Sequence, residues 1–243
     1  MKSTFYVFLF IFVLWPLCGM QASRSAVRPV AVPSQAMNLA RRIAQQRSKL
    51  AHTQHDLVRI LSNVRPHKFK REHVEPIVTA LAHQNALPLL AANKRVIEQS
   101  IRKFINTPGF FPSLQRVFIF AATDLNNFKG SLYELEHALQ IAEKNKGEQV
   151  TGINQRITCP EKVIKKEFDI CTTAGFVECK NINWPSLCAH SHYLRAQFEQ
   201  QHAIVKLLNA QNEHELYFKI SSKERIPNSW CQWFEDQGIS YSF

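Results

Sequence analysis

Three strand-like runs that follow one another closely in the second half of the 243-residue chain constrain the fold most strongly. They cover residues 149–157, 163–172 and 175–182, directly after a helical pattern at 131–144. The turn at 172–175 is short, so the second and third runs are expected to form an antiparallel hairpin. The sequence then predicts a helix at 194–208, a strand at 215–220, a helix at 228–237 and a last edge strand at 239–243. Residues 130–243 are therefore expected to form an α/β domain.

The first half of the chain differs from the second, because its pattern is helical and its charge is strongly positive. Helical spacing predicts helices at 34–63, 72–87, 89–105 and 110–122. Residues 23–130 hold 17 Lys and Arg against 5 Asp and Glu, whereas residues 131–243 hold 12 against 14. The net charge of +11 thus belongs to a basic all-α region at 23–129. Such an excess indicates an acidic partner, either nucleic acid or an anionic membrane.

Residues 1–22 have the layout of a secretory signal peptide. Lys2 precedes an apolar run at 5–17, which is shorter than the roughly 20 residues of a membrane-spanning helix. We expect cleavage after Ala22 and export to the periplasm or the medium, whereas an uncleaved signal would anchor the chain to a membrane. Five of the six cysteines lie in the second half, and export is compatible with one or two disulfides there as well as with buried thiols.

The hairpin carries the side chains with the clearest chemistry. In the segment 177–180 (VECK), strand alternation places Glu178 and Lys180 on one face, and Val177 and Cys179 on the other. Asp169 lies nine residues before Glu178, and the short turn is expected to bring the two carboxylates together. The same alternation predicts that Glu167 shares the face of Asp169, whereas Phe168 and Ile170 point into the core.

Two carboxylates and a lysine on adjacent strands suit the hydrolysis of a phosphodiester bond. Asp169 and Glu178 would bind Mg²⁺ or Mn²⁺ through hard oxygen ligands. Such an ion lowers the pKa of a bound water and offsets the charge that builds on the phosphate. Lys180 would orient or help to deprotonate the water and contact the phosphate.

An acid on one strand followed by Glu-x-Lys on the next resembles the PD-(D/E)xK nuclease superfamily, which has the restriction-endonuclease-like fold. Archaeal Holliday-junction resolvases and bacterial nuclease toxins belong to it. The resemblance covers about residues 130–243 and implies an α-β-β-β-α-β core with Asp169, Glu178 and Lys180 as the site. It implies another acid, a metal ligand, on the first helix, for which Glu134 is the first choice and Glu136 the alternative. Gln197 and Gln201 are candidates for a polar residue on the helix after the meander.

This resemblance implies a metal-dependent endonuclease that acts on nucleic acid. DNA is favoured over RNA because the resemblance is mostly to DNA enzymes, and an inhibitor or immunity protein is a conceivable partner. A membrane is expected as a partner only through an uncleaved signal.

Other patterns in the sequence give weaker functional signals. The segment Cys188-Ala189-His190-Ser191-His192 lacks a second pair of ligands at zinc-site spacing. Cys179 faces away from Lys180 in a regular strand, which argues against a thiol nucleophile. The alternative function is a non-catalytic exported protein that binds nucleic acid or anionic membrane through its basic helices. In that case Asp169, Glu178 and Lys180 would only form a solvated face of the hairpin.

Overall fold

A computed structural model describes residues 85–144, 147–159, 164–184, 191–211 and 215–243, together with scattered positions between 45 and 83. The signal peptide and its cleavage site, most of the predicted helices at 34–63 and 72–87, and the pair Cys188 and His190 lie outside the described residues. Residues 43–243 form one compact unit. The fold below is that of this unit.

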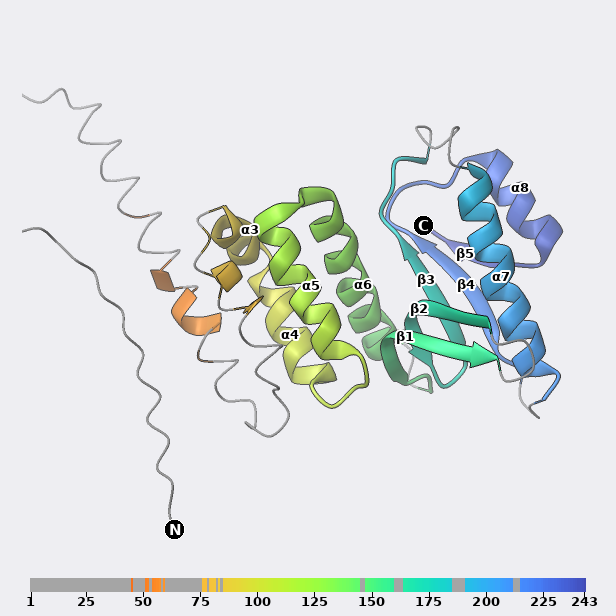
Figure 1. Cartoon of the computed structure of the whole chain (residues 1–243), viewed down its shortest axis with the longest axis horizontal. Coiled ribbons are helices and arrows are strands. Elements are labelled where there is room, and N and C mark those ends of the chain that lie inside the picture. The colour runs from red at the N-terminus through yellow and green to blue at the C-terminus, as the bar shows by residue number, and fades with distance from the viewer. Residues whose placement is uncertain are drawn as a thin grey trace, which may run out of the picture. The chain divides into compact units, whose positions relative to one another are not determined.

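Within the described residues 85–144, four helices precede the strands (Figure 1), namely α3 (Ala86–Ala92), α4 (Lys94–Phe104), α5 (Phe110–Thr123) and α6 (Leu125–Lys144). The predicted helix at 89–105 is divided at Asn93, whose side-chain amide donates to the carbonyl of Leu89 at 2.8 Å. The predicted helix at 131–144 begins earlier than expected, at Leu125. There the carboxylate of Asp124 accepts from the backbone N–H groups of Asn126 (2.9 Å) and Asn127 (3.1 Å), as an N-cap does.

The strands form one five-stranded mixed sheet in the order β1-β2-β3-β4-β5. Its strands are β1 (Val150–Cys159), β2 (Ile164–Thr172), β3 (Gly175–Lys180), β4 (Tyr217–Ser222) and β5 (Ser240–Ser242). The pairs β1–β2 and β2–β3 are antiparallel, whereas β3–β4 and β4–β5 are parallel. The parallel pairs need crossovers, which α7 (Ser191–Asn209) and α8 (Asn228–Gln237) supply. The predicted antiparallel hairpin and the mixed α/β class are confirmed.

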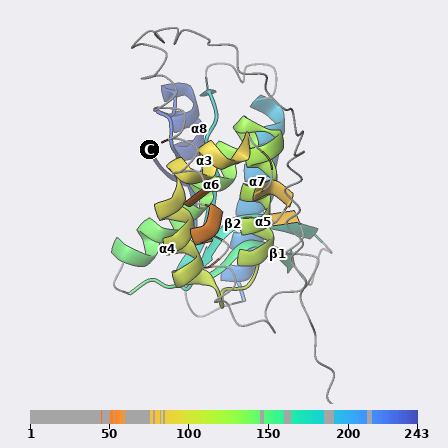
Figure 2. The ribbon, with the colours of Figure 1, turned by 90° about the vertical axis from the view of Figure 1, so that its left-hand side faces the viewer.

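Two hydrophobic cores lie on the two faces of this sheet. The first core joins helices α3 to α6 to Ile153, Ile170 and Val177. The second core contains Phe168 and Phe218 and is closed by side chains of α7 and α8. Figure 1 shows the sheet between α6 on one side and α7 with α8 on the other, and Figure 2 shows α4 and α5 in front of the strands.

The predicted boundary between residues 129 and 130 falls inside helix α6. This helix runs without a break from Leu125 to Lys144. The first core also contains buried side chains from both sides of the boundary, among them Phe118 and Val177, both 0% exposed. The boundary therefore does not separate two packed units, because the helices before it cover one face of the sheet after it.

Candidate active site

On β3, Glu178 and Lys180 are separated by one residue, and both side chains face helix α7. Lys180 Nζ is 2.5 Å from Glu178 Oε1 and 5.6 Å from the centre of the Phe198 ring. Val177 and Cys179 belong to the first core on the opposite face. Glu178 is only 3% exposed, so its charge is held by protein donors rather than by bulk water.

Helix α7 supplies the other donors to Glu178. Gln197 Nε2 donates to Glu178 Oε1 at 2.7 Å, and Gln201 Nε2 donates to Oε2 at 2.6 Å. Their i,i+4 spacing places both amides on one side of the helix. Gln201 also donates to the backbone carbonyl of Glu167 at 2.8 Å, and its own Oε1 is buried without a partner. Both glutamines named from the sequence therefore contact the Glu-x-Lys segment directly.

Asp169 lies where β2 and β3 begin to separate. The paired residues of these two strands are Ile170 with Val177 and Cys171 with Phe176. One position further from the turn, Asp169 Oδ2 accepts a hydrogen bond from the backbone N–H of Cys179 at 2.7 Å. A side chain thus takes the place of a backbone partner, and it holds the Asp169 carboxylate beside the Glu178-Cys179-Lys180 segment.

Glu134, the first choice on the preceding helix, faces the strands. Its Oε2 accepts from Asn154 Nδ2 of β1 at 2.9 Å. Glu136, the alternative, instead lies 3.3 Å from Lys223 Nζ, beyond the end of β4. The structure therefore brings Glu134 together with the predicted site and leaves Glu136 apart from it.

The electrostatics of this site is dominated by carboxylates that are close to one another. Burial, and then the negative charges of Glu178 and Glu134, raise the pKa of Asp169 well above its usual value. Burial also raises the pKa of Glu134, with a smaller contribution from Glu178. Burial acts to lower the pKa of Lys180, but the charges of Glu178 and Asp169 outweigh it and raise this pKa. The ammonium therefore stays charged beside these acids.

This donor set fits a hard divalent cation. Asp169, Glu178 and Glu134 offer carboxylate oxygens, and their mutual repulsion is what such an ion would relieve. Within the described ranges, no three His, Cys, Asp or Glu side chains already surround a single point as ligands would. Each carboxylate oxygen can accept more than one contact, so Gln197 and Gln201 could keep their hydrogen bonds while Glu178 bound an ion.

A polar network behind the site was not anticipated from the sequence. Asn154 donates to Ser113 Oγ (2.7 Å) as well as to Glu134, and its Oδ1 accepts from Arg116 at 3.1 Å. Arg116 also forms an ion pair with Glu167 at 2.8 Å. This network ties α5, α6, β1 and β2 together around Glu134.

Asn154 has φ = 50°, in the left-handed region that non-glycine residues seldom adopt. The register of β1 and β2 places it opposite Asp169, between the pairs Ile153–Ile170 and Gln155–Phe168. The side-chain alternation expected for β2 is interrupted here, since Phe168 lies in the second core and Ile170 in the first. The only local signal is that Asn tolerates this conformation better than most residues.

The remaining candidates among the described residues do not join the site. Cys171, Cys179 and Cys231 are free thiols among the described cysteines, and burial raises the pKa of Cys179 well above its usual value. Such a thiol is a poor nucleophile. His192 is exposed at the start of α7, next to Tyr193.

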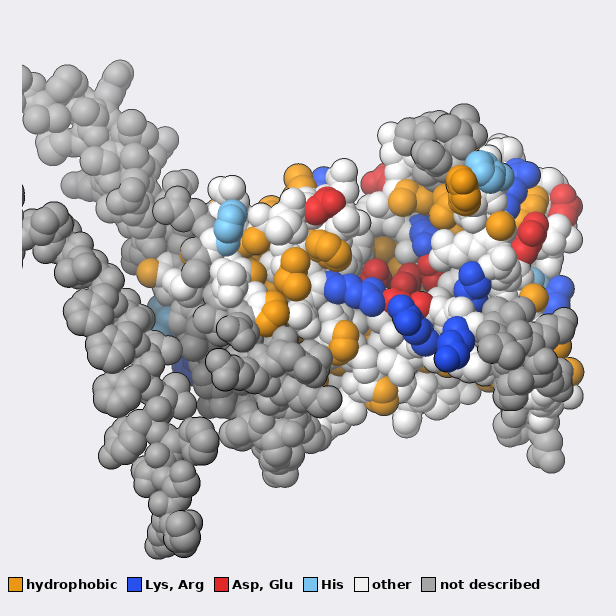
Figure 3. All heavy atoms as spheres, in the orientation of Figure 1, with side chains coloured by type: hydrophobic (Ala, Val, Ile, Leu, Met, Phe, Trp, Pro, Cys, Tyr) orange, Lys and Arg blue, Asp and Glu red, His pale blue; other side chains and the backbone are white. Residues whose placement is uncertain are grey.

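The surface above the site is mixed in charge. Figure 3 shows a group of Asp and Glu side chains between helix α6 and the strands, with Lys and Arg side chains on both sides of it. Arg116 and Arg156, which both contact Glu167, are 38% and 77% exposed. Positive side chains therefore border the acidic centre, on elements from both halves of the sequence.

In the part of the chain that the structure describes, no helix combines the length and the hydropathy that a membrane span requires. Comparisons with family models, with curated proteins and with solved structures found no match for this chain.

Proposed function

We propose that this protein is a divalent-metal-dependent nuclease of the PD-(D/E)xK kind, with the restriction-endonuclease-like fold. The observation that carries the proposal is the convergence of Asp169, Glu178 and Lys180 where β2 and β3 separate, with Glu134 directed at the same place from α6. The element order supports it: helix α6, three antiparallel strands, helix α7 and the parallel strand β4.

Each side chain has a role that follows from its position. Asp169, Glu178 and Glu134 would hold Mg²⁺ or Mn²⁺, which when bound supplies a water of lowered pKa and offsets negative charge on the phosphate. Lys180, kept protonated by Glu178 and Asp169, donates to the phosphate or positions the attacking water. Gln197 and Gln201 fix both oxygens of Glu178, so that its carboxylate does not rotate away.

The proposed substrate is nucleic acid, with DNA favoured over RNA. The sequence motif resembles mainly DNA enzymes, and the exposed Arg116 and Arg156 border the acidic centre. These guanidinium groups would contact phosphates and hold the strand beside the carboxylates. Export, and an inhibitor that restrains the enzyme before export, would accompany this function if residues 1–22 act as a signal.

The decisive experiment is a cleavage assay with supercoiled plasmid and with structured RNA. The full chain would be incubated with Mg²⁺ or Mn²⁺ and then with a chelator, beside Lys180→Ala and the control Lys206→Ala, which removes an exposed charge from α7. We expect cleavage that needs the metal, and a loss of about 10²–10³-fold in rate for Lys180→Ala only.

Thermal unfolding of both variants would check that they remain folded. Absence of metal-dependent cleavage, or full activity of Lys180→Ala, would contradict the nuclease proposal. Salt-sensitive binding of nucleic acid without any cleavage would favour the alternative of a non-catalytic binding protein.

A further inference from the structure

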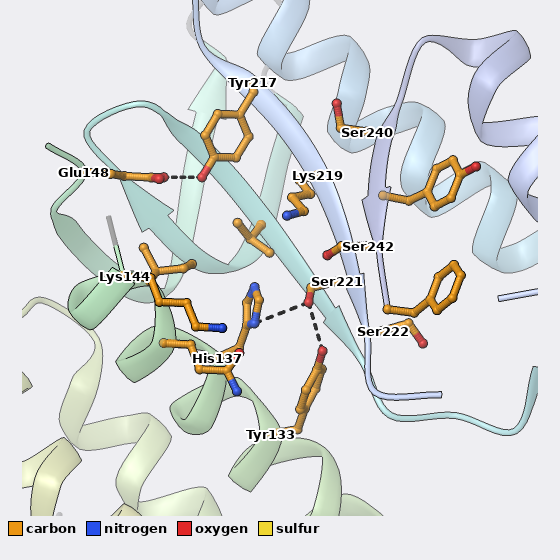
Figure 4. A pocket seen from close by; sticks show the side chains of 15 residues that line it. Tyr133, His137, Lys144, Glu148, Tyr217, Lys219, Ser221, Ser222, Ser240 and Ser242 are labelled. Atoms are coloured by element: carbon orange, nitrogen blue, oxygen red, sulfur yellow. Dashed lines mark hydrogen bonds between the residues drawn. The ribbon is translucent and has the colours of Figure 1, made fainter. Parts of the chain in front are cut away.

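The parallel part of the sheet has one face that none of the described helices covers completely. Parallel strands are normally covered on both faces. Helices α7 and α8 pack on one face of β4 and β5, but on the other face α6 leaves a pocket of about 690 Å³ (Figure 4). This volume is within the range of roughly 300–1,000 Å³ that is typical of small-molecule sites.

Polar side chains of β4 and β5 line the pocket beside aromatic and aliphatic ones, among them Val177, Tyr241 and Phe243. On β4, Phe218 and Ile220 point into the second core, whereas Lys219 and Ser221 line the pocket. On β5, Ser240 and Ser242 line it. A face that packs against a helix carries mainly aliphatic side chains, so Lys219 and these serines indicate a site for a ligand with both polar and apolar parts.

Positive groups converge on the pocket from two elements. Lys219 extends from β4 and Lys144 from α6 toward the space that they enclose, where the imidazole of His137 also lies (Figure 4). Burial, then the charges of Lys219 and Lys144, lower the pKa of His137, which places the two ammonium groups near its ring. Among the described residues, neither lysine belongs to an ion pair, so both charges are available to an anion.

The acid that lines the pocket is already engaged. The hydroxyl of Tyr217 donates to the carboxylate of Glu148, as the dashed line in Figure 4 marks. This hydrogen bond occupies one oxygen of Glu148, whose charge also acts on His137. The lining between α6 and β4 also holds the donors Lys144, Lys219 and Ser221.

Hydroxyl groups lie beside the imidazole of His137. Ser221 Oγ is 2.9 Å from Tyr133 Oη and 3.4 Å from His137 Nδ1. Burial raises the pKa of Tyr133 to about 12, so its hydroxyl remains a donor at neutral pH. Two ammonium groups beside hydroxyl and imidazole donors form the kind of donor set that binds phosphate oxygens.

We propose that this pocket binds the phosphate group of a phosphate monoester of nucleotide size, between Lys219 and Lys144, with Ser221 as a hydrogen-bond donor. The site does not depend on the proposed nuclease activity. Tyr133 contacts Ser221 on β4, whereas its neighbour Glu134 contacts Asn154 on β1. In the sheet, β4 and β1 lie on opposite sides of β3, so the two sites lie on different sides of α6.

Calorimetric titration of the full chain in the presence of a chelator tests this proposal without any metal-dependent reaction. The probes are AMP, adenosine, inorganic phosphate, and a short oligonucleotide with or without a 5′-phosphate. We expect AMP to bind at least about tenfold more tightly than adenosine, and Lys219→Gln to weaken AMP binding by about tenfold. The matched control Lys206→Gln, on the opposite side of the sheet, should leave it unchanged.

Equal binding of AMP and adenosine, or no binding of any phosphorylated probe at millimolar concentration, would overturn the proposal, as would full affinity of both Lys219→Gln and Ser221→Ala. Tighter binding of the 5′-phosphorylated oligonucleotide than of AMP would support it and identify a nucleic-acid end as the source of the phosphate. Lys180→Ala should bind AMP normally, so this result and the outcome of the cleavage assay can be told apart.

Discussion

Asp169 combines a hydrogen bond that favours its charged form with an environment that opposes it. The N–H of Cys179 donates to its carboxylate, but burial and the charges of Glu178 and Glu134 have the larger effect and raise its pKa. An acid whose pKa is higher in the folded than in the unfolded state stabilises the fold only at low pH. That contribution is lost as the pH rises through the pKa of the folded state.

Asp169→Asn is therefore expected to increase the free energy of unfolding at pH 7 in the presence of a chelator. The amide oxygen can still accept from Cys179, and one of three neighbouring negative charges is removed. The gain should shrink toward acid pH, where Asp169 itself becomes protonated. Urea unfolding at several pH values measures this, with Asp236→Asn as an exposed control. Lower stability of Asp169→Asn at pH 7 would contradict the electrostatic picture.

The site residues differ in how far the sequence could predict them. Asp169, Glu178 and Lys180 depend on strand alternation and one short turn, which are local properties. The role of Asn154 depends on its hydrogen bonds to Ser113 on α5 and Glu134 on α6, which are 41 and 20 positions away in the sequence. Its left-handed backbone has no strong signature in the sequence, and neither does the resulting change of face between Phe168 and Ile170.

At the scale of elements, the connection between α4 and α5 fixes the helices to the sheet. The carbonyl of Pro108 accepts from the N–H of Ile153 at 3.0 Å, and Gly109 follows with φ = 76°. A Cβ atom on Gly109 would lie 1.8 Å from the carbonyl oxygen of Ile153. The start of α5 therefore approaches β1 as closely as only glycine permits, directly beside Asn154.

Gly109→Ala is expected to lower the free energy of unfolding by roughly 2–5 kcal/mol, because it adds both backbone strain and a clash with the backbone of β1. Gly130→Ala is the matched control. Gly130 lies inside α6, and a Cβ atom there meets nothing within 4 Å. That substitution should stabilise the protein by about 0.5–1 kcal/mol. Equal effects of the two substitutions in urea unfolding would refute the role of Gly109.

The ends of the helices show which signals in the sequence were ambiguous. Helical spacing continues through Asn93, so it did not reveal that the Asn93 side chain competes for the carbonyl of Leu89. Ser131 resembles an N-cap, but Asp124 caps the helix earlier, and Ser131 is buried inside α6. The pocket between α6 and β4 could not be predicted either, since it arises from the pairing of β4 with β5 and from the position of α6 over them.

At the scale of the whole molecule, the difference in charge between the two halves of the sequence does not correspond to a division into domains. The helices before residue 130 and the sheet after it share the first core, and the sheet joins the first core to the second. Arg116 of the basic half contacts Glu167 of the acidic half at the candidate site. Removal of residues 1–129 would therefore expose the apolar face of the sheet as well as remove positive charge.

This arrangement predicts that residues 85–243 unfold in a single cooperative transition. Trp184, Trp230 and Trp233 all lie in or against the second core, whereas much of the helical signal comes from the helices of the first core. In a Trp15→Phe background, where these are the remaining tryptophans, urea unfolding curves from fluorescence and from far-UV circular dichroism should coincide.

The substitution Leu135→Ala, in the first core, tests whether the two cores unfold together. Leu135 is 0% exposed in the first core, and its truncation should cost about 2–5 kcal/mol. Because the sheet joins the cores, the variant should lower the midpoint seen by the tryptophans of the second core as much as the midpoint seen by circular dichroism. Phe234→Ala, in the second core, should do the same in the reverse direction. A variant that shifts one curve and leaves the other in place would instead show two units that unfold independently, as the charge pattern of the sequence had suggested.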